Sequence, residues 1–360
     1  MAVVFACVRC DAVLTAPVSR RALPVHAHQK YGHQLLPALM ESGTYAVDPE
    51  PSGPPWRPRS EIGPDGAEAR GVFAPVSGLS FGAPGAIVVA PGDTRDTVLI
   101  PERCGGYCMG LDGSDGPNLA CAGCGQEVGT RIDDCSYWQA VRLDPRAVRR
   151  LPTDGPACRT IEWEALAEER PGTPPVEQSG RWDPRWEAAT GAALAHLLAA
   201  SEGAPVTVPD GLLTDMFGRA LAALLPPGPS AAPTRKAALA GPGLPALTQA
   251  GDIALVPCHP QTGKAWQPHS TAPAPAPVVP LAAEVWTYLN SPHERLPVPA
   301  TGGLPDDVLR DDPLPPHPRR PLRPDWAIFL NTLAHLPAVH QPWLRRIYDD
   351  VRDHPYVAPF

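Results

Sequence analysis

Two short stretches decide the fold of the first part of the chain: Ala2-Val-Val-Phe-Ala-Cys-Val-Arg-Cys10 and Cys121-Ala-Gly-Cys-Gly125. Each stretch holds one Cys-x-x-Cys pair, and together they supply four thiols, Cys7, Cys10, Cys121 and Cys124. A Cys-x-x-Cys turn places both sulfur atoms on the same side, so two such turns can surround one zinc ion tetrahedrally with Zn–S bonds of about 2.3 Å. The sequence therefore predicts a four-cysteine zinc site.

The residues around the two pairs are those expected of strands and tight turns. Apolar, β-prone residues lead into Cys7, and β-prone residues follow Cys124. Gly125 suits the end of the second turn, because glycine adopts a positive φ without steric cost. This arrangement resembles the zinc ribbon. The whole chain prefers arginine over lysine and is rich in alanine and proline, a composition that resembles proteins of high-GC actinobacteria. The N-terminal half is similar to uncharacterised zinc-ribbon proteins of such organisms. The resemblance covers only the two turns and their strands, and it implies no activity.

The spacing of the two pairs departs from a simple ribbon. Between Cys10 and Cys121 lie 110 residues, where simple ribbons have about 15–20. Each doubling of the loop length adds about 0.6 kcal/mol to the free-energy cost of closing the loop. The nearly three doublings from a simple ribbon to this spacing therefore cost roughly 2 kcal/mol. A structural zinc ion contributes on the order of 10–16 kcal/mol. The spacing therefore permits a ribbon that is split by a long insertion.

The other cysteines leave alternatives open. Cys104 and Cys108 precede the second pair by only 12 residues, so the rival ligand set is Cys104, Cys108, Cys121 and Cys124. A local group of four cysteines is also compatible with an iron–sulfur centre, although no standard spacing matches. If the split ribbon forms, Cys104, Cys108 and Cys135 remain, either as a second, incomplete site or as buried thiols.

Composition narrows the class of protein. The nine cysteines are an odd number, and the N-terminal apolar run is interrupted by Arg9, so we expect reduced thiols in a cytoplasmic protein rather than a secreted disulfide scaffold. The net charge of −8 disfavours nucleic acid as a partner, because binding to phosphates requires a positive field. No apolar run is long enough to span a membrane, so we expect no membrane contact.

Three histidines suggest a second hypothesis, a metal-dependent hydrolase. His26 and His28 would share one face of a strand, and His33 follows five residues later. No succession of strands and helices that would carry further ligands is visible, so we assign no catalytic residue. A third hypothesis is a ribbon that binds nucleic acid weakly through a small basic group, Arg9, Arg20 and Arg21.

The fold class that we predict is α+β in two domains. Residues 1–142 form a β-rich zinc-ribbon domain with a long insertion between the two pairs, including a hairpin over 86–100. Residues 143–360 form a proline-rich domain of short helices, with a lone strand near 253–256 and extended linkers near 268–280 and 297–324. Fifty prolines in 360 residues support this, because proline ends helices.

The sequence does not decide whether the protein is an enzyme, but it favours a non-enzymatic role. The expected function is that of a zinc-stabilised, cytoplasmic interaction or regulatory protein. Its only expected cofactor is structural Zn²⁺, and its partner is a protein that the sequence does not identify.

Overall fold

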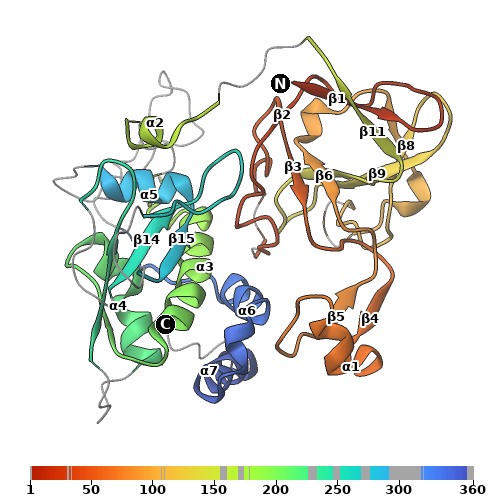
Figure 1. Cartoon of the computed structure of the whole chain (residues 1–360). Helices are drawn as coiled ribbons and strands as arrows, with labels where there is room; N and C mark the ends of the chain where they lie inside the picture. The colour runs from red at the N-terminus through yellow and green to blue at the C-terminus, as the bar shows by residue number, and fades with distance from the viewer. Residues whose placement is uncertain are drawn as a thin grey trace. The chain divides into compact units, whose positions relative to one another are not determined.

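The computed structural model describes residues 2–354 except 31, 34, 107, 109, 155–159, 169–173, 178, 226–232, 246–251, 269–275, 292–317 and 319. The chain divides into two compact units (Figure 1). Unit 1 comprises 1–70, 75–160 and 260–263, and unit 2 comprises 71–74, 161–259 and 264–360. Unit 1 thus continues past the predicted boundary at residue 142, since its last strand follows that position.

Unit 1 is built mainly of short strands. Its elements are β1 (Val3–Cys7), β2 (Ser19–Arg20), β3 (Thr44–Asp48), β4 (Trp56–Pro58), α1 (Arg59–Glu68), β5 (Gly78–Ser80), β6 (Ala86–Val89), η1 (Pro91–Asp93), β7 (Thr97–Leu99), η2 (Pro101–Arg103), β8 (Leu119–Cys121), β9 (Glu127–Ile132), β10 (Ala140–Leu143) and β11 (Val148–Pro152). Strands at the start of the chain and after Cys124 are therefore confirmed.

Seven of these strands form one sheet in the order β2-β3-β6-β10-β9-β8-β7. The β1 strand pairs separately with β11, with Cys7 opposite Val148. The predicted hairpin over 86–100 is wrong: β6 pairs with β3 and β10, whereas β7 pairs with β8. Both β6 and β7 have β-prone sequences, but local turn residues do not determine which strand is the partner.

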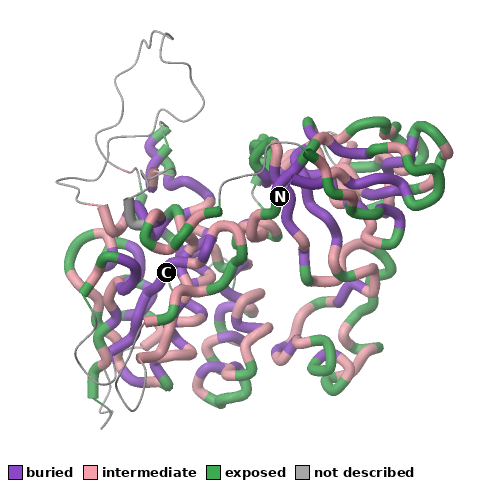
Figure 2. Tube along the Cα trace, turned by 45° about the horizontal axis from the view of Figure 1, so that its top comes forward, coloured by how far each residue is buried: buried purple, intermediate pink, exposed green. Residues whose placement is uncertain are grey.

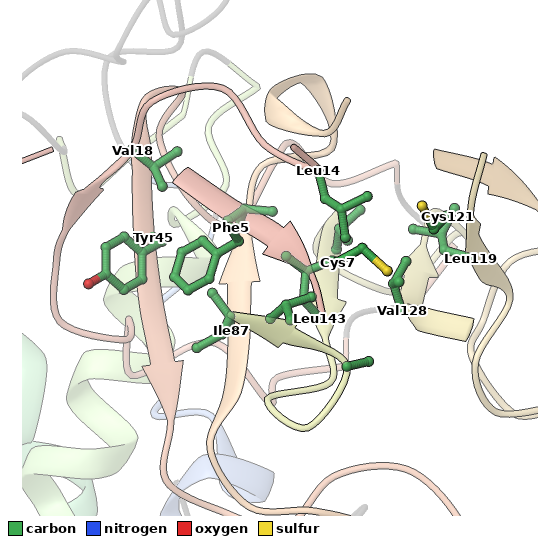
Figure 3. Close-up of a cluster of buried hydrophobic side chains, with 14 of the residues drawn as sticks. Phe5, Cys7, Leu14, Val18, Tyr45, Ile87, Leu119, Cys121, Val128 and Leu143 are labelled. Carbon is green, nitrogen blue, oxygen red and sulfur yellow. The ribbon is translucent and has the colours of Figure 1, made fainter. Parts of the chain in front are cut away.

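The core of unit 1 joins β1 to the large sheet. Phe5 and Tyr45 pack edge to face, with ring centroids 5.1 Å apart, among aliphatic side chains from β1, β6, β9 and β10. Figure 3 shows that the side chains of Cys7 and Cys121 belong to this buried cluster. Buried positions dominate β1, β3, β6 and β8, whereas all three residues of β4 are exposed, and Figure 2 shows how buried and exposed positions alternate along the chain. Both cysteine pairs are thus attached to a rigid core.

Unit 2 combines helices with a parallel sheet. Its elements are α2 (Trp163–Glu168), α3 (Pro184–Ser201), β12 (Val206–Thr207), α4 (Leu212–Leu224), β13 (Arg235–Leu239), β14 (Ile253–Pro257), β15 (Val278–Leu281), α5 (Ala283–Asn290), α6 (Trp326–Ala334), η3 (Pro337–His340) and α7 (Pro342–Asp353). The strands lie in the order β12-β13-β14-β15, all parallel, and α3 packs against β15 and α6.

The helices follow from sequence signals. Asp183 caps α3 by accepting a hydrogen bond from the Arg185 backbone N–H at 2.8 Å, and Pro184 occupies the first helical position, where its missing N–H costs nothing. The α4 helix buries its apolar stripe, which includes Met216 and Phe217. The closing helices predicted near 325–335 and 342–353 are confirmed as α6 and α7.

The second unit is mainly helical among its described elements, as predicted, but the prediction of a lone strand in it is wrong. The predicted strand, β14, is the third of four parallel strands. The predicted linker near 268–280 ends in β15, an edge strand that tolerates Pro280. Most of the linker predicted near 297–324 lies outside the described residues. Over the described part of the chain, no helix combines the length and apolarity needed to cross a membrane.

Candidate metal centre

The first cysteine turn follows directly from β1. The backbone N–H of Cys7 donates to the carbonyl of Ala12 at 2.9 Å, and the N–H of Asp11 donates to the carbonyl of Cys7 at 3.0 Å. Asp11 closes this turn with φ +64°, a left-handed conformation that aspartate adopts more readily than most residues. The turn leaves Cys7 buried and Cys10 exposed.

The second turn repeats this pattern 114 positions later in the chain. Here the N–H of Cys121 donates to the carbonyl of Gln126, and the N–H of Gly125 donates to the carbonyl of Cys121, both at 2.8 Å. Gly125 has φ +71°, which confirms the conformation that the sequence predicted for it. The two turns thus have the same hydrogen-bonding geometry, and each presents two sulfur atoms.

The four sulfur atoms lie at the separations that a tetrahedral metal requires. Cys7 Sγ is 3.7 Å from Cys124 Sγ, and Cys10 Sγ is 3.5 Å from Cys121 Sγ. All four lie within 4.8 Å of one another. Zn–S bonds of 2.3 Å at the tetrahedral angle place two sulfur atoms about 3.8 Å apart. The cluster has the size of a four-thiolate metal site.

The thiols of the cluster affect each other's ionisation. Burial raises the pKa of Cys7, but donation from the backbone N–H groups of Arg9 and Cys10 and from the Cys124 thiol lowers it overall. For Cys10 the backbone N–H of Ala12 lowers the pKa, but the neighbouring thiols, led by that of Cys124, raise it to about 12. The thiols around Cys10 thus suppress its ionisation. A metal ion would reverse this effect, since it binds thiolates and displaces their protons.

The rival ligand set is not assembled. Cys121 and Cys124 lie with Cys7 and Cys10, while Cys108 lies with His33 and Cys135. The Cys104 thiol donates instead to the carbonyl of Ile100 at 3.2 Å. Local proximity in sequence fails here because β8 carries Cys121 away from the loop that holds Cys108.

The second cluster contains two of the remaining cysteines and one histidine. His33 Nδ1 lies 3.7 Å from Cys108 Sγ and 3.6 Å from Cys135 Sγ. The Cys108 thiol raises the pKa of Cys135 to about 11. The sequence suggested an incomplete second site, but it did not indicate His33 as a member, because 75 residues separate His33 from Cys108.

The three histidines of the hydrolase hypothesis do not converge. His26 packs against Trp138 with the rings tilted at 48° and their centroids 4.4 Å apart. His28 Nε2 lies 3.4 Å from the buried carboxylate of Asp48, and His33 joins the second cluster. Residues 25–28 form a turn rather than a strand, so the expected common face does not exist. His26, His28 and His33 therefore share no common site.

The basic group proposed for nucleic acid has no further support. Arg9 and Arg20 are exposed, and Arg21 is partly buried. Nucleic-acid binding through these residues stays a prediction.

Comparison with known proteins found no matching family model, no matching curated protein and no matching solved structure. The fold and the site therefore define a class rather than a family. The chain is a mixed α/β protein with two clusters, one of four cysteines and one of a histidine and two cysteines, each able to hold a metal ion. The resemblance to actinobacterial zinc-ribbon proteins stays a prediction.

Proposed function

We propose that Cys7, Cys10, Cys121 and Cys124 hold one structural zinc ion, and that the chain is a zinc-stabilised interaction or regulatory protein. The observation that supports this is the agreement between the sulfur separations of 3.5 and 3.7 Å and the roughly 3.8 Å of tetrahedral zinc–thiolate geometry. Four thiolate ligands in a tetrahedral arrangement favour zinc over hard cations such as Mg²⁺ and Ca²⁺, which prefer oxygen ligands.

A structural role follows from the number of ligands. Four thiolates fill the coordination sphere of zinc and leave no position for water or substrate, unlike catalytic zinc sites. The ion would join the end of β1 to the turn after β8, and so link two parts of unit 1 that are distant in sequence. The four-cysteine centre then contributes stability and not chemistry.

The interaction role draws support from the strand beside this centre. β7 is an edge strand of the large sheet and pairs with β8, with Thr97 opposite Cys121. It exposes two apolar side chains, Val98 at 50% and Leu99 at 42%. An exposed edge strand can accept a strand from another protein through backbone hydrogen bonds, with its side chains giving specificity. We propose that the partner is a protein segment that binds in this extended form.

Metal content tests the structural site. Under reducing conditions, Cys121→Ser should lose one zinc ion per chain, and unit 1 should unfold at lower denaturant concentration. Cys104→Ser is the matched control, because its side chain can still donate to the carbonyl of Ile100, and it should keep the metal content of the wild type. Wild-type protein without zinc, or a Cys121→Ser variant with undiminished zinc, would contradict the proposal.

The interaction role is tested at β7. Val98→Lys places a charge on the edge strand, a substitution that blocks strand addition, and should leave the zinc content unchanged. Val25→Lys is the control, since Val25 is also exposed but lies outside the strands. A protein partner captured by the wild type and by Val25→Lys should be lost with Val98→Lys. If Val98→Lys captures the same partner with equal affinity, β7 is not the interaction surface.

A further inference from the structure

A second cluster in unit 1 has the ligands and dimensions of another kind of metal site. His33 comes from the segment before β3, Cys108 from the loop after η2, and Cys135 from the turn after β9. The three ligand atoms lie within 4.8 Å of one another. None of the three belongs to the four-cysteine centre, so the cluster requires its own explanation.

The separations agree with tetrahedral zinc. Zn–N bonds of 2.0–2.1 Å and Zn–S bonds of 2.3 Å place nitrogen and sulfur about 3.6 Å apart. His33 Nδ1 lies 3.7 Å from Cys108 Sγ and 3.6 Å from Cys135 Sγ. Both contacts therefore fit one ion bound to all three atoms.

The loop that carries Cys108 is held in place by carboxylates. Asp134 Oδ2 accepts hydrogen bonds from the backbone N–H groups of Cys108 at 3.4 Å and Gly110 at 3.2 Å. Since Cys135 is the next residue after Asp134, this contact fixes the two cysteines relative to each other. Such groups behind the ligands orient metal sites in general.

Glycine permits this close approach. A Cβ at Gly106 would lie 2.6 Å from Asp134 Oδ2 and 2.8 Å from the Cα of Gly110. A Cβ at Gly105 would lie 2.4 Å from Asp115 Oδ2, which accepts the Gly105 N–H at 2.9 Å. The Cys-Gly-Gly-Tyr-Cys sequence thus lets the loop fold tightly against two carboxylates.

We propose that His33, Cys108 and Cys135 bind a second zinc ion whose fourth position is open to solvent. In the part of the chain that the structure describes, no further histidine, cysteine, aspartate or glutamate joins the three. His33 and Cys108 are exposed and Cys135 is half-buried, so water reaches the site. Three protein ligands with an open position are the arrangement of catalytic rather than structural zinc. The fourth ligand is a water molecule that small anions or imidazole can replace.

Zinc binding at this site exchanges two thiol protons and most of the bound waters of the ion for three protein ligands. The two thiols lose their protons to solvent, neutral His33 binds through Nδ1, and the zinc ion gives up all but one of its bound waters. No oxidant or other reactant takes part. The second site therefore needs reduced cysteines but no partner protein.

Metal counting on the full chain under reducing conditions tests the site. Wild-type protein should bind two zinc ions, and His33→Ala and Cys108→Ser should each bind one. Cys104→Ser, in the same loop, is the matched control and should bind two. Gly106→Ala should also bind one, because its Cβ displaces Asp134. Circular dichroism should show that His33→Ala remains folded, since His33 is exposed.

The two proposals fail in different ways. A wild type that binds only one zinc ion, kept in His33→Ala and lost in Cys10→Ser, would overturn the second site and support the four-cysteine site. A wild type that binds only one zinc ion, kept in Cys10→Ser and lost in His33→Ala, would overturn the four-cysteine site and support the second site. Two zinc ions in His33→Ala would also overturn the second site.

Cobalt substitution tests the open position. Co²⁺ in place of zinc gives visible absorption bands that depend on the ligands, and added imidazole or azide should shift those of the wild type. His33→Ala, which retains only the closed four-cysteine site, should show no shift. A wild-type spectrum that azide and imidazole both leave unchanged would overturn the open position.

Discussion

Asp48 offers a quantitative test of the packing in unit 1. Its carboxylate is fully buried at the end of β3 and forms an ion pair with Arg142 of β10, which is 11% exposed. His28 Nε2 lies 3.4 Å from the same carboxylate oxygen, Asp48 Oδ2. Burial alone would raise the pKa of Asp48, but His28 and Arg142 together lower it to about 2. Asp48→Asn keeps the shape of the side chain and removes the charge.

The lowered pKa sets the size and the pH dependence of the effect. A drop from 3.8 to about 2 corresponds to about 2 kcal/mol of folding stability, at 1.36 kcal/mol per pKa unit. Because the folded-state pKa is the lower one, this contribution is complete above the unfolded-state value near 4 and disappears as the pH falls through 2. Asp48→Asn should therefore cost about 2 kcal/mol near pH 5, with the difference from wild type shrinking below pH 4.

Urea unfolding of both proteins between pH 7 and pH 2 measures this difference. Asp144→Asn is the control, because its partner Arg146 is 75% exposed and exposed ion pairs contribute only about 0–1 kcal/mol. A loss for Asp48→Asn no greater than for Asp144→Asn, or one independent of pH down to 2, would refute the reasoning.

Three further substitutions test the turns and the helix packing. Gly125→Ala should destabilise unit 1 by about 1–2 kcal/mol, because alanine is strained at φ +71°, and thermal unfolding of the zinc-loaded protein measures it. Asp11→Gly relieves φ +64° in the matching turn but also removes the exposed ion pair with Arg149, so stability in the same assay should change by no more than about 1 kcal/mol; a larger loss would contradict the equivalence of the two turns. Gly191→Ala should cost unit 2 about 1–3 kcal/mol, because its Cβ would lie 2.4 Å from the Asp325 carbonyl oxygen; unchanged urea unfolding would show that α6 shifts without cost.

The four-cysteine cluster could be predicted because each half of it is a short sequence motif, Cys-x-x-Cys. Each Cys-x-x-Cys turn specifies its own geometry, and only the pairing of two turns over 110 residues required an energy argument. The positive φ at Gly125 could be predicted from the residue type. The positive φ at Asp11, the equivalent position of the first turn, could not, because aspartate occurs in many backbone conformations. The hydrogen-bonding equivalence of the two turns became visible only in the structure.

The second cluster and the parallel sheet had no local signal. His33, Cys108 and Cys135 meet through the tertiary fold, so no spacing rule applies to them. Arg235–Leu239 contains no β-branched residue, and Val278–Leu281 contains a proline and follows an Ala-Pro run. Both become strands because β14, which is fully buried, lies between them, and such tertiary context overrides propensity.

The distance between the two cysteine pairs sets the order of events when the chain is made. Cys7 and Cys10 leave the ribosome first, and 110 further residues follow before Cys121 appears, which takes roughly 5–20 s at about 5–20 residues per second. During that interval the first pair has only two of the four ligands and cannot close a metal site. The four-cysteine cluster can therefore assemble only after the second pair has been made, and the strand pairing of β1 with β11 can be completed only later still.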